Sequence, residues 1–106
     1  MPFVSIVKSD ENGVDEAVNK AIDLIDGLES IKRRKKIAIK PNLCQPKSSY
    51  SGATTDPRII DALIRKINSA MSCEIDIVET NNSKANADET YNYLGYDVLS
   101  QKYKNV

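Results

Sequence analysis

The side chains of this sequence that could do chemistry lie mainly in two short stretches. One is Lys40-Pro41-Asn42, and the other is residues 51–57, with the sequence SGATTDP. The second stretch combines a glycine, two threonine hydroxyls and an Asp-Pro pair typical of a helix start, where backbone N–H groups attract anions. Lys40 adds a positive charge, and Asn42 an amide that both donates and accepts. These are the components of a site for a small anionic or polar ligand.

The strands that must position these residues follow from three short apolar segments. Residues 3–7 are β-branched and uncharged, residues 36–40 (KIAIK) end at a proline, and residues 74–79 (EIDIVE) alternate polar and apolar side chains. Each pattern is typical of a strand. The last two segments lead directly into polar loops, which places Lys40 and Glu79 at strand ends.

Helices are predicted from apolar residues spaced three and four apart. One runs from Val14 toward Leu28, with Gly27 near its end, and a second begins at Asp56-Pro57 and buries a stripe of isoleucines and leucines. A short helix is expected from Asp88 to Gly95. A last helical piece covers residues 97–103, with Val98 and Leu99 facing inward.

The order β-α-β-α-β-α predicts an α/β fold: a Rossmann-like three-layer arrangement whose parallel sheet has about three strands and helices on its faces. We expect one domain over residues 1–106. Three strands are few for such a sheet, which predicts an incomplete layer. A missing C-terminal region or a second copy, hence a homodimer, would complete it.

Ligands of open parallel sheets bind where the carboxyl ends of the strands meet. The predicted ligand-binding residues are therefore those that three segments bring to this end: Lys40, Asn42, Gly52, Thr54, Thr55, Asp56 and Glu79.

Each candidate also has a simpler structural role. Asp56 is a good helix cap, Thr54 and Thr55 suit a turn, and Lys40 and Glu79 suit solvated strand ends. Whether the protein is an enzyme is left open. If it is, Lys40 is the expected electrostatic or covalent participant, and Asp56 or Glu79 the proton acceptor.

Composition excludes several classes of function. The chain has no histidine, so a histidine base, a Ser-His-Asp triad and a His-ligated metal are excluded, and two cysteines are too few for a Cys-rich metal site. We predict no metal. Fifteen basic residues balance fifteen acidic ones, and the basic run at residues 32–36 fits a solvated helix end, which disfavours nucleic acid. No apolar segment is long enough for a membrane helix, and the expected location is cytoplasmic.

Three motifs carry a resemblance to a known family: K-P-N at residues 40–42, G-A-T-T-D-P at residues 52–57, and L-G-Y at residues 94–96. In order and spacing they resemble the family called domain of unknown function 362. The resemblance implies that this chain is the N-terminal portion of a longer family domain, and it implies no particular activity. Some longer relatives carry iron–sulfur clusters on extra Cys-rich motifs. This sequence lacks such motifs, so no cofactor is predicted.

The leading hypothesis is therefore a domain that binds a small anionic or polar molecule at the carboxyl ends of its strands. The alternative is a non-catalytic interaction or assembly subunit that uses an open sheet edge, since an unpaired edge is a template for strand addition.

Overall fold

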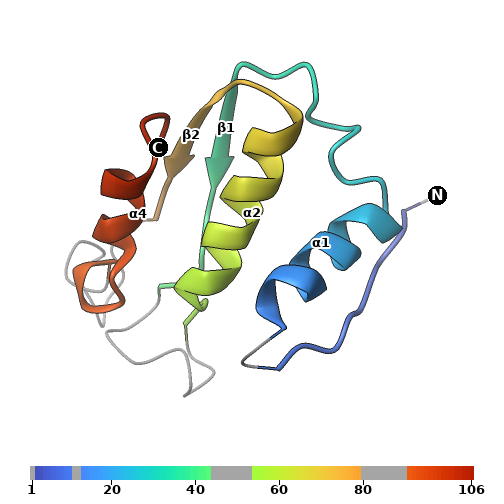
Figure 1. The fold of residues 1–106 in the computed structure, drawn as a ribbon, viewed down its shortest axis with the longest axis horizontal. Coiled ribbons are helices and arrows are strands. Elements are labelled where there is room, and N and C mark those ends of the chain that lie inside the picture. The colour runs from blue at the N-terminus through green and yellow to red at the C-terminus, as the bar shows by residue number, and fades with distance from the viewer. Residues whose placement is uncertain (1, 11–12, 44–53, 80–90) are drawn as a thin grey trace.

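A computed structural model of the protein describes residues 2–10, 13–43, 54–79 and 91–106 (Figure 1). These ranges form a mixed α/β structure, as predicted, and residues 91–93 are helical as well. The named elements are α1 (Val14–Leu24), β1 (Lys36–Ile39), α2 (Pro57–Ala70), β2 (Glu74–Ile77) and α4 (Tyr96–Lys102).

The sheet consists of β1 and β2, which pair in parallel with Lys36 opposite Glu74 and Ile39 opposite Ile77. Parallel neighbours need a crossover connection, and α2 provides it. Side chains alternate along both strands, so Ile39 and Ile75 are buried on one face while alternate positions are exposed on the other. The pair therefore has one apolar face and one polar face.

α2 forms where the sequence predicts it. The Asp56 side chain accepts the Arg58 backbone N–H at 2.9 Å, and Pro57 occupies the first helical position, where no N–H is needed. The apolar stripe of α2 is buried against the sheet, except that Ile59 is exposed. The buried residues of this helix are Ile60, Ala62, Ile64 and Ile67.

The core lies between the apolar face of the sheet and the two helices α2 and α4. Its fully buried side chains are Tyr96, Leu43, Ile64, Ile67 and Ile75. α1 lies beside α2, at the opposite end of this helical layer from α4 (Figure 1). No residue of α1 is buried.

Within the described ranges the predicted three-layer arrangement is not confirmed. A parallel sheet covered on both faces has nearly continuous apolar strands. β1 and β2 instead carry charge on the second face, where Lys36 Nζ lies 3.3 Å from an Asp76 carboxylate oxygen. These charged side chains pair with one another, so this face of the sheet can remain in contact with water.

Residues 3–7 do not form the predicted strand. They run beside α1, where the Ser5 hydroxyl donates to the Ala21 carbonyl at 2.6 Å, and among the described residues the sheet has two strands. Phe3, Val4 and Ile6 remain exposed. A β-branched segment becomes a strand only when another strand's backbone lies alongside it, which composition alone does not supply.

Two smaller expectations also need correction. α1 ends at Leu24, before the predicted end near Gly27, and a series of turns leads from there to β1. In α4, Leu99 is buried as predicted, but Val98 is exposed. The expected helix start at Asp88 lies outside the described residues. None of the helices in the described ranges has the length and apolar composition that crossing a bilayer requires.

Candidate functional site

The predicted site residues that the structure describes lie together at the carboxyl ends of β1 and β2. Lys40 directly follows β1, and Glu79 lies two residues beyond β2. Their side chains form an ion pair, with 3.0 Å between Lys40 Nζ and Glu79 Oε1. The pair is unequal in exposure, because the lysine side chain is 62% exposed and the glutamate side chain only 11%.

Glu79 has a second partner in the chain that follows β1. Its Oε2 accepts the backbone N–H of Leu43 at 3.2 Å. Leu43 is fully buried, so this contact fixes the carboxylate against the core. Glu79 thus joins the ends of both strands, and the simpler interpretation of a solvated strand end is wrong.

The residues before α2 are tied to the residues after β1 by a short antiparallel bridge between Leu43 and Thr54. The Asn42 N–H donates to Thr55 Oγ1 at 2.9 Å, and the Thr55 N–H donates to the Asn42 carbonyl at 2.9 Å. Thr54 is buried. The spacing of apolar residues in the sequence gives no signal for the pairing of residues 42–43 with residues 54–55. Gly52, the remaining predicted site residue, lies outside the described ranges, as does Cys44.

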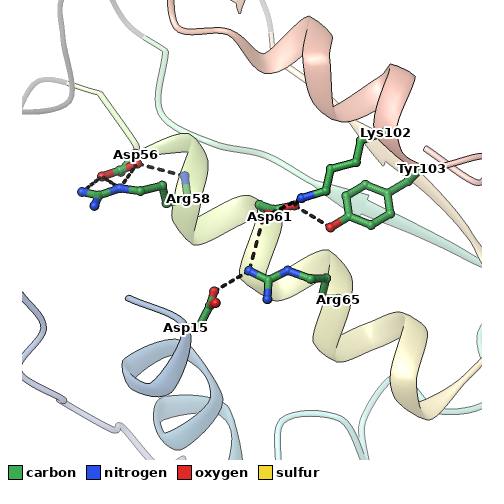
Figure 2. Close-up of polar contacts among 7 residues, drawn as sticks. All are labelled: Asp15, Asp56, Arg58, Asp61, Arg65, Lys102 and Tyr103. Carbon is green, nitrogen blue, oxygen red and sulfur yellow. Dashed lines mark hydrogen bonds and ion pairs between the residues drawn. The ribbon is translucent and has the colours of Figure 1, made fainter. Parts of the chain in front are cut away.

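Asp56 caps α2 and also forms a bidentate ion pair with Arg58 (Figure 2). Arg58 Nε donates to both carboxylate oxygens, at 3.2 and 3.0 Å, and a terminal guanidinium nitrogen donates to Oδ2 at 2.7 Å. These hydrogen bonds outweigh burial and lower the pKa of Asp56. A carboxylate held in its ionised form is a weak proton acceptor, so the geometry disfavours Asp56 as a catalytic base.

Two further residues belong to this site although the sequence did not identify them. One is Arg58, whose position two residues after the capping aspartate is its only sequence signal. The other is Tyr96, which the sequence places only in the L-G-Y motif. Its side chain is fully buried, its hydroxyl donates to the Thr55 carbonyl at 2.7 Å, and burial raises its pKa.

The charges of the site balance, but their exposure does not. Lys40 and Arg58 face Glu79 and Asp56, two positive against two negative groups. The cations are 62% and 44% exposed, whereas the anions are 11% and 19% exposed. A molecule arriving from solvent therefore meets ammonium and guanidinium groups first. Among the described side chains, no cluster of three or more His, Cys, Asp or Glu residues could hold a metal ion.

A second polar cluster joins three helices away from this site (Figure 2). At its centre Asp61 of α2 accepts hydrogen bonds from the Tyr103 hydroxyl at 2.5 Å and from Lys102 Nζ at 3.1 Å. Arg65 bridges Asp61 to Asp15 of α1. Burial acts to raise the pKa of Asp61, but the hydrogen bonds from Tyr103 and Lys102 outweigh burial and lower it.

Comparison with known proteins agrees with the motifs. No curated protein and no solved structure gives a significant match to this chain. One family model, described as "Domain of unknown function (DUF362)", matches residues 37–105, a range that contains the K-P-N, G-A-T-T-D-P and L-G-Y motifs. Because the match covers more than half of the sequence, the chain belongs to this family.

Proposed function

We propose that the protein binds a small anionic or polar molecule at the carboxyl ends of β1 and β2. The observation that carries the proposal is the unequal exposure of the site's charges, since Lys40 and Arg58 face solvent while Glu79 and Asp56 are largely covered. A cationic surface over fixed carboxylates suits a phosphate or carboxylate group.

Lys40 is the principal contact in this proposal. Its ammonium is mostly exposed and holds Glu79 through a single 3.0 Å contact, so it can donate to a ligand while keeping that partner. Arg58 keeps its bidentate bond to Asp56 and adds a second positive charge to the site. Asn42 and Thr55, which hydrogen-bond to each other, belong to the segments that follow β1 and precede α2.

The test compares two lysines of the same strand. Lys36 and Lys40 flank β1 at opposite ends, are similarly exposed, and each pairs with an acidic residue at or beyond β2. Thermal unfolding is followed with increasing inorganic phosphate and, separately, acetate at constant ionic strength. We expect the melting temperature of the wild type and of Lys36→Ala to rise, because binding to the native state stabilises it. Lys40→Ala should lose most of this rise.

An equal rise in both variants would show that the anions stabilise the protein without Lys40, and it would overturn the site. No rise in the wild type with either anion would overturn the class of ligand.

A second candidate function, assembly through the sheet, is favoured by the open edge of β1. The carbonyls of Lys35 and Ile39 bond to β2, so by parallel pairing the backbone groups of Lys36 and Ala38 point the other way. Within the described ranges no strand lies on that side. The outer edge of β2 is partly occupied, because the Ile75 N–H on that side donates to the Asn105 carbonyl at 2.8 Å.

The occupant that we propose for this edge is residues 3–7 of a second copy, which would extend the sheet toward the Rossmann-like order and make a homodimer. Phe3, Val4 and Ile6 are 77%, 85% and 92% exposed, an apolar surface that pairing would cover. Light scattering across concentration tests it. We expect a dimer that Ile6→Lys converts to a monomer, and a wild-type monomer at high concentration would exclude the dimer.

A further inference from the structure

Tyr96 connects the C-terminal part of the chain to the ligand site. The tyrosine is the first residue of α4, its side chain is fully buried, and its hydroxyl donates to the Thr55 carbonyl at 2.7 Å. The two residues are 41 positions apart in the sequence. This hydrogen bond therefore reaches from one side of the core to the segment that leads into α2.

The contact adds to two hydrogen bonds between Thr55 and Asn42. The Thr55 N–H donates to the Asn42 carbonyl, the Thr55 hydroxyl oxygen accepts the Asn42 N–H, and the Thr55 carbonyl accepts the Tyr96 hydroxyl. A peptide unit is planar, so holding the Thr55 carbonyl also sets the direction of the Asp56 N–H. Asp56 in turn caps α2 and holds Arg58.

We propose that Tyr96 is a positioning residue of the ligand site. Its hydroxyl holds the peptide between Thr55 and Asp56, and through Asp56 it sets where the guanidinium of Arg58 lies. This inference rests on the proposed function, and it extends the site to α4, whose L-G-Y motif lies within the family match.

A role in packing alone would involve the ring and not the hydroxyl. The Tyr96 ring lies against Tyr91, with ring centres 5.6 Å apart, and among buried side chains such as Leu43 and Ile64. Phenylalanine would fill the same space. Tyr96→Phe therefore removes the hydrogen bond and leaves the packing in place.

A matched control lies in the same region of the chain. Tyr103 directly follows α4 and also donates its hydroxyl to one acceptor, a carboxylate oxygen of Asp61, away from the ligand site. Tyr103→Phe removes a hydroxyl of the same kind. The wild type and both variants are compared by amide hydrogen exchange at Thr55 without ligand and by titration with inorganic phosphate.

We expect Tyr96→Phe to speed exchange at the Thr55 amide and to weaken phosphate binding, each by roughly two- to tenfold, the range for one lost net hydrogen bond. Tyr103→Phe should leave both quantities near their wild-type values. Unchanged exchange and affinity in Tyr96→Phe, with a wild type that binds phosphate, would overturn the positioning role alone. Equal losses in both variants would show general loosening and would also overturn it.

Failure of the proposed function gives a different result. In that case the wild type binds neither phosphate nor acetate, and the inference about a ligand site falls with it. The comparison of hydrogen exchange is made without ligand, so it does not depend on anion binding. If the wild type binds phosphate and Tyr96→Phe changes neither exchange nor affinity, the positioning role alone is wrong.

Discussion

Glu79 is the residue on which the candidate site depends most. Its largely covered carboxylate forms an ion pair with the Lys40 ammonium and accepts a hydrogen bond from the Leu43 N–H. The exposed lysine contributes little to folding, because exposed ion pairs add at most about 1 kcal/mol. The hydrogen bond from the buried Leu43 N–H contributes more to stability, because a buried donor left without its partner costs about 1–3 kcal/mol.

We therefore predict different effects on stability for the two partners of this pair. Glu79→Ala should lower the free energy of unfolding by about 1–3 kcal/mol, whereas Lys40→Ala should change it by less than about 1 kcal/mol. Unfolding in urea at neutral pH measures both. Glu74→Ala is the control, because Glu74 is an exposed acidic residue of β2 whose nearest lysine nitrogen is 4.0 Å away. A loss as large in Glu74→Ala would contradict the assignment.

At the scale of elements, a helix or strand was predictable where the residues that determine it lie close together in the sequence. α2 was predictable because a cap, a proline and an apolar stripe are all local features. β1 and β2 were predictable because their alternation matches a half-covered sheet. Residues 3–7 have equal strand character but no partner strand, and pairing is a property of the neighbour. The bridge between Leu43 and Thr54 was missed for the same reason.

Gly95 sets the start of α4. It has a φ of 81°, in the left-handed region, and a side chain added there would meet no atom within 4 Å. Gly95→Ala should therefore cost only its backbone strain, about 1–2 kcal/mol, and lower the melting temperature by several degrees. Asparagine tolerates this conformation better, so Gly95→Asn should lose less. Equal losses in the two variants would indicate that backbone conformation is not the cause.

At the scale of the whole molecule, the proximity of Lys40 to Glu79 was predictable, because parallel strands end at one edge. Sequence reasoning could not predict the partners of each side chain. The ion pair between Arg58 and Asp56 and the hydrogen bond from Tyr96 to Thr55 depend on how α2 and α4 pack. The spacing of apolar residues in a sequence does not describe this packing. The number of layers could not be predicted because the spacing of apolar residues does not show which sheet face a helix covers.

The cluster around Asp61 ties α1 and α4 to α2, and it predicts how the protein responds to acid. Hydrogen bonds from Tyr103 and Lys102 outweigh burial and hold the pKa of Asp61 below its ordinary value of 3.8. The unfolded chain therefore binds this proton first. The stability that Asp61 adds is fully present at neutral pH and is lost as the pH falls below about 4.

Asp61→Asn should thus be less stable than the wild type at pH 7, and the difference should shrink between about pH 5 and about pH 3. Urea unfolding at a series of pH values measures this. Asp97→Asn, a change in α4 outside the cluster, should keep the acid response of the wild type. A constant difference between Asp61→Asn and the wild type across this range would contradict the prediction.

The parallel register of β1 and β2 also constrains the order of folding. Lys36 pairs with Glu74, so the chain must close a long loop before the first strand contact forms, and no hairpin can start the process. Contacts of such sequence separation slow folding. The chain in that loop includes α2, so we expect strand pairing and helix packing to form together in the transition state. A change that strengthens α2 should then speed folding itself, while a change in α1 should act mainly on the rate of unfolding.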